Sequence, residues 1–192
     1  MAAARTNAPL VEVCILAGGL SARMGRDKAR LRLGGKTLLT HIQAAVAPLN
    51  CPTRVVRRDM VPRCGPMGGV YTALKTSPAR SVLFLSCDMP FVPISLLRRI
   101  RRALGPKTLA VFVRHEGIAG FPFLLRVQAL PEVEELLRQR NLALHELEEI
   151  LKARAVRPTR GESRFLLNVN TPEDWTEAKR LWTSLQGEAG GG

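Results

Sequence analysis

The sequence predicts a three-layer α/β fold, in which a mostly parallel sheet is covered by helices on both faces. Two observations predict it. Short segments such as 11–15 and 81–85 are largely apolar, as strands buried on both faces are. They alternate with longer segments of helical character, which is the order of βαβ units. Of the 192 residues 46% are hydrophobic, and we expect one domain over residues 1–192, with an ordered core at about 10–186.

The first half of the chain alternates strands and helices. Residues 11–15 are the first expected strand, and the turn formers Gly34 and Gly35 precede the first helix. The third helix ends in an arginine run at 98–102, where cations complement the negative end of the helix dipole. In order, the segments are strand 11–15, helix 36–47, strand 53–57, helix 67–76, strand 81–85, helix 94–104 and strand 108–113.

After residue 114 the pattern changes to α+β. The closing helix is expected at 172–185, with Thr171 as its N-cap and Pro172 in its first turn. The elements before it are a strand at 121–126, helices at 133–139 and 142–151, and a short strand at 164–167.

Composition excludes several classes of protein. No apolar segment approaches the 18 or more residues that span a bilayer, and the first ten residues lack the apolar core of a secretory signal. The four cysteines are widely spaced without a CxxC pair, which favours buried thiols over a disulfide framework or a zinc site. We therefore expect a cytoplasmic protein without a membrane partner. The cysteines are Cys14, Cys51, Cys64 and Cys87.

The chain is strongly basic, with 29 Lys and Arg against 16 Asp and Glu and a net charge of +13. This charge suits phosphate-rich ligands and is compatible with weak binding of nucleic acid. The arginines are spread along the chain, however, and the aromatic residues, 5% of the total, do not interleave with them as in a platform for stacking bases. The sequence therefore favours a solvated basic surface over a nucleic-acid partner.

A glycine-rich loop follows the first expected strand. It contains Gly18, Gly19 and Gly25 together with Arg23 and Lys28. Glycines let backbone N–H groups approach an anion closely, and the two cations neutralise its charge. This composition predicts a phosphate-binding loop.

Two further loops are expected at the same carboxyl edge of the sheet, where open parallel sheets bind their ligands. Residues 65–69 open a helix and present free N–H groups. Asp88 follows an apolar strand directly, where a carboxylate is well placed to hold Mg²⁺. Each loop alone is also explained as a turn, and Asp88 as a helix cap. Their occurrence together favours a nucleotide site.

Five motifs occur in a fixed order between residue 11 and about residue 185. In these motifs and their order the sequence resembles the nucleotidyltransferases that attach a nucleotide to molybdopterin, specifically the molybdenum cofactor guanylyltransferases. The first is typical of the nucleotidyltransferase superfamily, and the last points to the molybdopterin branch. They are Leu16-Ala17-Gly18-Gly19-x-Ser21-x-Arg23-Met24-Gly25-x-Asp27-Lys28, Asp59 followed by Gly65-Pro66-Met67-Gly68-Gly69, Cys87-Asp88-Met89-Pro90, Phe121-Pro122-Phe123-Leu124, and Asn168-Val169-Asn170-Thr171-Pro172-Glu173.

The resemblance implies a Rossmann-like nucleotidyltransferase fold that acts on GTP and molybdopterin with Mg²⁺ as cofactor. The molybdopterin phosphate would attack the α-phosphorus of GTP and release pyrophosphate. Such a reaction needs no protein nucleophile, because positioning and charge stabilisation can supply most of the acceleration. Recipient molybdoenzymes or cofactor-biosynthesis proteins are the implied protein partners.

The resemblance also implies roles for individual residues. Backbone groups of Leu16, Ala17 and Gly18 would contact guanine and ribose, and Gly19 would permit close approach. The catalytic cations Arg23 and Lys28 would face the triphosphate. Asp59 would lie beside the nucleotide, and Asp88 would bind Mg²⁺. Asn168 and Asn170 would place the pterin. Simpler roles remain open: surface charges for Arg23 and Lys28, a strand end for Asp59 and turn residues for the two asparagines.

One departure from the family pattern lies between the first helix and Asp59. The family usually has an additional strand and helix there, whereas this chain has only residues 49–58. We therefore expect a sheet one strand smaller than in the family and a more open nucleotide pocket. Two alternatives to a guanylyltransferase follow: a molybdopterin cytidylyltransferase, and a non-catalytic accessory protein that binds molybdopterin or a partner. Related cytidylyl enzymes tend to have Ala at the position of Gly18, which favours guanine.

Overall fold

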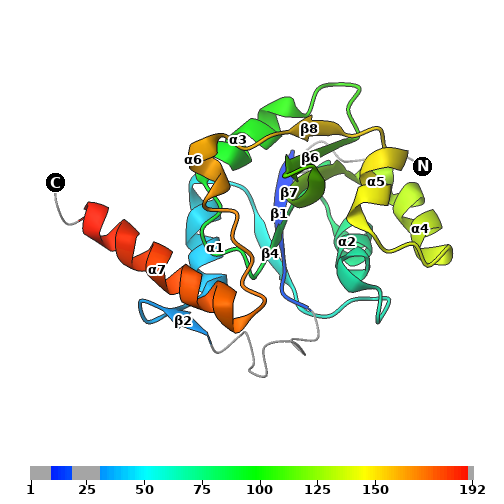
Figure 1. The fold of residues 1–192 in the computed structure, drawn as a ribbon. Coiled ribbons are helices and arrows are strands. Elements are labelled where there is room, and N and C mark those ends of the chain that lie inside the picture. Colours follow the sequence, from blue (N-terminus) through cyan, green and yellow to red (C-terminus); the bar gives the residue numbers. More distant parts are fainter. Residues whose placement is uncertain (1–9, 19–30, 190–192) are drawn as a thin grey trace.

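The computed structural model describes residues 10–18 and 31–189, and the structural statements below concern these residues (Figure 1). A six-stranded mixed sheet forms their centre. In spatial order its strands are β4 (Thr53–Val56), β1 (Val11–Leu16), β5 (Ser81–Ser86), β7 (Ile118–Arg126), β6 (Ala110–His115) and β8 (Arg154–Val156).

The sheet is mostly parallel, as predicted. β1 is parallel to β4 and β5, and β6 is parallel to β8. β7 runs antiparallel to both of its neighbours, β5 and β6. The reason is the connection between β6 and β7, which consists only of Glu116 and Gly117, both with positive φ. A two-residue turn of this kind makes a hairpin and reverses the strand.

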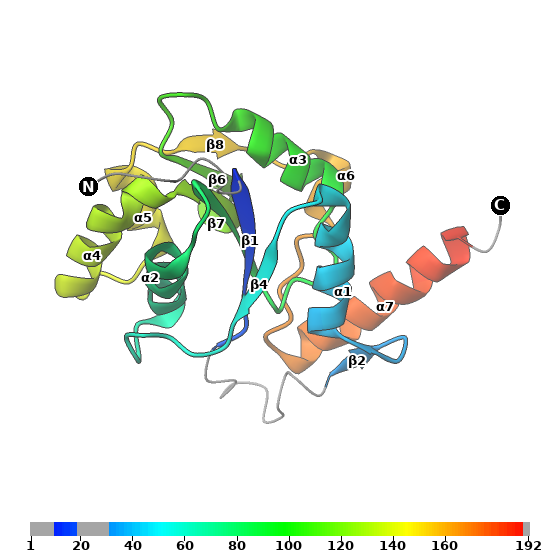
Figure 2. The ribbon, with the colours of Figure 1, turned by 180° about the vertical axis from the view of Figure 1, so that it is seen from behind.

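Helices cover both faces of the sheet, so the predicted three-layer arrangement is confirmed (Figure 2). β1 shows how the sequence sets up the layers, because its side chains alternate between the faces. Cys14 and Leu16 belong to the apolar cluster on one face, and Val13 and Ile15 to the cluster on the other. The first cluster is covered by α2 (Gly65–Thr76), α4 (Leu130–Arg138) and α5 (Leu144–Ile150), the second by α1 (Leu38–Val46) and α3 (Ile94–Ala103).

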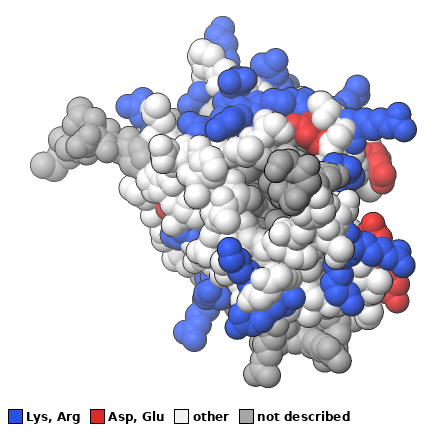
Figure 3. All heavy atoms as spheres, turned by 90° about the vertical axis from the view of Figure 1, so that its left-hand side faces the viewer, with Lys and Arg blue, Asp and Glu red and all other residues white. Residues whose placement is uncertain are grey.

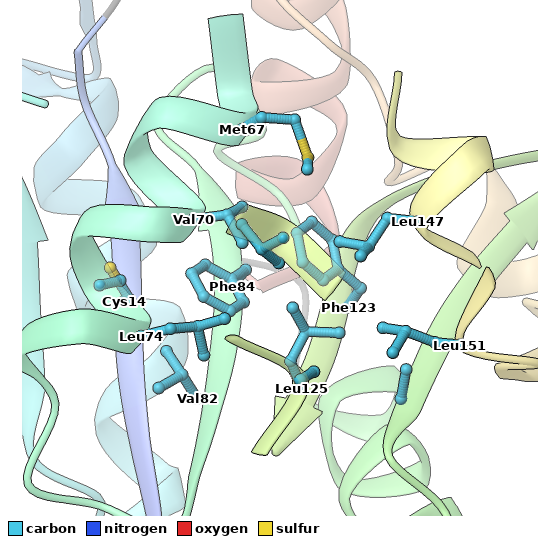
Figure 4. Close-up of a cluster of buried hydrophobic side chains, with 14 of the residues drawn as sticks. Cys14, Met67, Val70, Leu74, Val82, Phe84, Phe123, Leu125, Leu147 and Leu151 are labelled. Atoms are coloured by element: carbon cyan, nitrogen blue, oxygen red, sulfur yellow. The ribbon is translucent and has the colours of Figure 1, made fainter. Parts of the chain in front are cut away.

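Stacked aromatic rings lie at the centre of the first cluster (Figure 4). The ring of Phe123 lies 4.9 Å from that of Phe84 and 4.6 Å from that of Phe112, and all three side chains are fully buried. The three residues occupy matching positions on β5, β7 and β6. The stack therefore joins three neighbouring strands on one face of the sheet.

The expectation of buried cysteines is confirmed for Cys14 but not for Cys51, Cys64 and Cys87, which are only half-buried. Cys14 is fully buried in β1, and burial raises the pKa of its thiol to about 12. All four cysteines are free thiols. Within the described residues, no helix has the length and apolarity needed to cross a membrane.

The C-terminal helix α7 (Pro172–Ala189) begins as predicted. The Thr171 hydroxyl accepts a hydrogen bond from the Asp174 N–H at 3.1 Å, which caps the helix. α7 packs on the small hairpin of β2 (Arg32–Leu33) and β3 (Lys36–Thr37), seen beside it in Figure 1. At Gly34, where φ is +52°, a Cβ would lie only 2.5 Å from the Trp182 ring, so this position requires glycine.

Two sequence predictions need correction. The first helix begins at Leu38, because residues 36–37 form β3 and Thr37 caps the helix. It is followed by the short 3-10 helix η2 (Ala47–Leu49), and a similar turn, η3 (Val127–Ala129), precedes α4.

The strand predicted at 164–167 is wrong. The chain there leaves the short helix α6 (Arg160–Ser163) through turns, in which Phe165 and Leu166 donate backbone hydrogen bonds to Glu162 and Ser163. Leu166 packs on the second core cluster and Leu167 on the cluster beneath α7. Because the two side chains pack in different directions, the segment has the alternating apolar pattern of a strand, although no strand among the described residues pairs with it.

Candidate functional site

The first and third predicted loops leave the sheet side by side. The Leu16 carbonyl accepts a hydrogen bond from the Cys87 N–H at 3.0 Å, and the Ala17 N–H donates to the Val56 carbonyl at 2.8 Å. These bonds join the carboxyl ends of β1, β4 and β5. The structure therefore confirms that the loops share one edge of the sheet, which is where α/β sheets bind ligands.

Asp59 lies between the start of the first loop and the beginning of α2. A Cβ added to Gly18 would be 3.7 Å from Oδ1 of Asp59, and one added to Gly69 would be 3.4 Å from the same atom. At Gly68 the Cβ would meet Oδ2 at 3.0 Å and the Val61 carbonyl oxygen at 2.8 Å. The glycines thus allow two segments, the start of the first loop and α2, to approach one carboxylate. Burial there raises the pKa of Asp59 above its usual value.

The first turn of α2 keeps its N–H groups free of a side-chain cap. The Thr72 hydroxyl fixes the preceding loop: it accepts from the Met60 N–H and donates to the Gly68 carbonyl, both at 2.8 Å. A helix start with uncapped N–H groups has a partial positive charge that favours anions. The structure thus confirms the prediction that residues 65–69 open a helix and present free N–H groups.

Asp88 and the two predicted asparagines are brought together. The Val169 N–H donates to the backbone carbonyl of Asp88 at 2.8 Å, so Asn168 and Asn170, on either side of Val169, lie beside the turn that follows β5. Asn168 is exposed and Asn170 is half-buried. Segments about 80 positions apart in the chain therefore lie side by side.

A hollow of about 430 Å³ adjoins these asparagines. This volume is within the range of small-molecule sites, roughly 300–1,000 Å³. Sequence reasoning missed two of its polar residues, His115 and Arg164, because no motif contains them and only the fold brings them to the asparagines. The lining residues are His115, Ser163, Arg164, Leu166, Leu167, Asn168, Asn170 and Asp174.

Three predicted site residues, Gly19, Arg23 and Lys28, lie outside the described residues. Among the described residues, no group of three or more His, Cys, Asp or Glu side chains forms a metal site by itself. Mg²⁺ does not require one, because it is commonly held by one or two carboxylates, with substrate phosphates and water completing its shell. The single carboxylate of Asp88 is compatible with that kind of site.

Residues 13–157 match the model of the MobA-like NTP transferase domain. The chain belongs to this family. It is 31% identical over 196 residues to the molybdenum cofactor guanylyltransferase of Rhizobium johnstonii, covering 90% of this chain and 93% of the relative. It is 28% identical over 192 residues to the probable molybdenum cofactor guanylyltransferase of Carboxydothermus hydrogenoformans, covering 89% of this chain and 96% of that protein.

A solved structure agrees with this membership at the level of the fold. The molybdopterin-guanine dinucleotide biosynthesis protein A from Archaeoglobus fulgidus superposes with a TM-score of 0.70 at 21% identity, covering 90% of this chain and 99% of that one. The Rossmann-like nucleotidyltransferase fold expected from the sequence is thereby confirmed. In this MobA-like domain, β4 is an edge strand of the sheet, and it is the one strand described between α1 and Asp59.

Proposed function

We propose that this protein transfers GMP from GTP to the phosphate of molybdopterin and releases pyrophosphate. One observation carries the proposal: the hydrogen bond from Val169 to Asp88 places the expected acceptor segment beside the carboxylate expected at the nucleotide phosphates. The guanylyltransferase names of the relatives that match nearly the whole chain support the same activity.

The chain's own contribution to this reaction is positioning. The acceptor phosphate is already an anion near neutral pH, so no protein group has to remove a proton from it. The backbone of residues 16–18 and the uncapped start of α2 would hold the nucleotide, while Asn168 and Asn170 would hold the acceptor beside it. Holding two reactants in line converts a bimolecular step into an effectively unimolecular one.

Asp88 would hold Mg²⁺ when the nucleotide is bound. The ion would supply positive charge that stabilises the phosphate oxygens in the transition state. Gly18 favours guanine through the resemblance, since related cytidylyl enzymes tend to have Ala at this position. In this protein a Cβ there would lie 3.1 Å from the Arg57 carbonyl oxygen, closer than most such contacts, so the local packing suits glycine.

The proposal is tested by incubating the protein with molybdenum-loaded molybdopterin, Mg²⁺ and each of the four labelled nucleoside triphosphates in turn. We expect a labelled guanine dinucleotide and one pyrophosphate per transfer from GTP. Transfer from CTP alone would overturn the guanine assignment. No transfer from any nucleotide, by protein that binds molybdopterin, would support the accessory-protein alternative.

Asp59→Asn is expected to change stability and nucleotide binding in opposite directions. Because burial raises the carboxyl pKa, the folded state holds the proton more tightly than the unfolded state. The wild-type protein therefore loses stability relative to the variant as the pH rises from the usual Asp value of 3.8 through the raised one. Urea unfolding at several pH values measures this difference, and calorimetry should show weaker GTP binding by the variant. Parallel pH curves for the two proteins would contradict the expectation.

A further inference from the structure

The positive charge of the chain is concentrated in two segments that are distant in the sequence. Residues 94–109 and 151–165 together contain ten Lys and Arg and one acidic residue, Glu162. The other 161 residues contain 19 Lys and Arg and 15 Asp and Glu, so their charges nearly balance. The two segments are less than a fifth of the chain, yet they account for nine of its thirteen net positive charges.

The fold brings these two segments together on one side of the molecule. The Arg99 guanidinium donates to the Arg157 carbonyl at 2.7 Å, and the Arg154 guanidinium donates to the Ala103 carbonyl at 3.4 Å. In Figure 3, Lys and Arg side chains gather over the upper part of the face, the level at which α3 and α6 lie in Figure 1. We call this surface the basic face. Its cations are Arg98, Arg99, Arg101, Arg102, Lys107, Lys152, Arg154, Arg157, Arg160 and Arg164.

Most of this charge is not neutralised within the described part of the protein. The one acidic residue of the two segments, Glu162, is buried and accepts a hydrogen bond from the Arg99 guanidinium at 2.5 Å. Arg98, Arg102 and Arg157 are exposed, and no carboxylate among the described residues forms an ion pair with any of them. Surface charges of one sign at this density attract a partner of the opposite charge and speed its association.

The cations of the basic face are mainly arginines, with eight Arg and two Lys. Some of the guanidinium groups are held by backbone carbonyls: Arg101 donates to Leu49 at 3.2 Å, in addition to the bonds of Arg99 and Arg154. A guanidinium has five N–H donors, so one such bond orients the group and leaves donors for a partner. Its planar fork binds a carboxylate through two parallel hydrogen bonds, which the ammonium of lysine cannot do. The basic face therefore suits carboxylate groups.

Two other kinds of partner fit the basic face less well. Single-stranded nucleic acid is bound through aromatic rings that stack on its bases as well as through cations. The one aromatic residue of the two segments is Phe165, and the Arg164 guanidinium already lies over its ring, 4.6 Å from the centroid. A second copy of this chain has the same net charge of +13 and would be repelled. An acidic protein has the opposite charge and supplies carboxylates.

We propose that the basic face is a docking surface for an acidic protein, whose Asp and Glu side chains pair with the exposed arginines of α3, β8 and α6. The inference goes beyond the proposed reaction and does not depend on it, because the cations of the basic face belong to none of the five motifs. Arg164 connects the two, since it also lines the hollow beside Asn168 and Asn170. A protein docked on the basic face would therefore lie at the rim of that hollow.

The triple variant Arg98→Gln, Arg102→Gln and Arg157→Gln tests the proposal, and a triple lysine variant at the same positions keeps the charge. Binding of labelled poly-L-glutamate is measured by fluorescence anisotropy at about 0.15 M salt, where exposed charges more than about 8 Å apart are largely screened from each other. The glutamine variant should bind about tenfold more weakly, which is the combined effect of losing three exposed ion pairs. The lysine variant should lose about threefold, because an ammonium cannot bind a carboxylate through a planar fork.

The matched control removes three exposed cations that lie outside the basic face and form no ion pair among the described residues. It should change the affinity for poly-L-glutamate by less than about twofold. Thermal unfolding and GTP binding of every variant check the fold and the nucleotide site, so that a loss of docking is not confused with failure of the proposed reaction. The control variant is Lys36→Gln, Arg140→Gln and Lys179→Gln.

The inference is overturned if the wild-type protein does not bind poly-L-glutamate, or if the glutamine variant and the control lose affinity equally. A lysine variant with full affinity would also overturn it, since charge alone would then act. Labelled single-stranded DNA of the same net charge is measured in parallel. If the DNA binds more tightly than poly-L-glutamate and the glutamine variant weakens that binding, the basic face serves nucleic acid and not an acidic protein.

Discussion

Asp88→Asn is expected to lower kcat for GMP transfer by about a thousandfold while leaving the fold intact. Asparagine has the same shape as aspartate but no charge, so it is a much poorer ligand for Mg²⁺. The backbone carbonyl that accepts the Val169 N–H is retained, so the acceptor segment keeps its place. Single-turnover transfer from labelled GTP measures the loss, and circular dichroism and thermal unfolding check the fold.

Glu149→Gln is the control for this substitution, because it removes one exposed negative charge from α5, outside all five motifs. We expect it to retain nearly full activity. The Mg²⁺ dependence of GTP binding gives a second measure, since binding by the Asp88 variant should respond weakly to the metal. An Asp88 variant with wild-type kcat and wild-type metal dependence would rule out a metal-binding role for this carboxylate.

Phe123→Ala is expected to lower the free energy of unfolding by about 3–5 kcal/mol, the usual result of deleting a buried aromatic ring. Phe123 is fully buried between the rings of Phe84 and Phe112 and also contacts the ring of Phe121, so its removal leaves a cavity and breaks three aromatic contacts. A loss of this size is a large part of the stability of a typical domain, about 5–15 kcal/mol. Urea unfolding followed by fluorescence gives the difference.

Two further variants keep this prediction testable if the alanine protein does not fold. Phe123→Leu should lose about 1–2 kcal/mol, because leucine fills most of the space but cannot stack. Ile118→Ala, at the start of the same strand, should change stability by less than about 0.5 kcal/mol because its side chain is 72% exposed. Equal losses at positions 123 and 118 would show that the aromatic stack does not hold the strands together.

The sequence predicts the strands whose apolar pattern is local and continuous. β1 and β5 are buried on both faces, so their composition alone marks them. β8 escaped prediction because only three residues pair with β6, and just one of them, Val156, is buried. The direction of β7 was also not predicted, because it depends on the turn at Glu116 and Gly117, and turn geometry leaves little trace in hydrophobic periodicity.

The residues of the candidate site also differ in how well the sequence predicts them. Loops that follow predicted parallel strands have to meet at one edge, and the structure confirms this for Leu16, Asp59 and Asp88. The roles assigned to these residues remain predictions. Only some of the residues that line the hollow could be predicted from the sequence. Asn168 and Asn170 belong to a motif, whereas Arg164 and His115 come from a short helix and a strand end that only the tertiary structure brings together.

The hydrogen bond from the Val169 N–H to the Asp88 carbonyl allows the separation of these two segments to be measured. Val169 is fully buried and its amide hydrogen bridges two segments that are distant in the chain, so this hydrogen exchanges with solvent only when the segments separate. Its exchange rate therefore measures how often the two halves of the site part. If each segment holds one substrate, as the proposed function requires, nucleotide and acceptor bound together should slow that rate more than either does alone. A deuterium-exchange experiment can observe this without any chemical turnover.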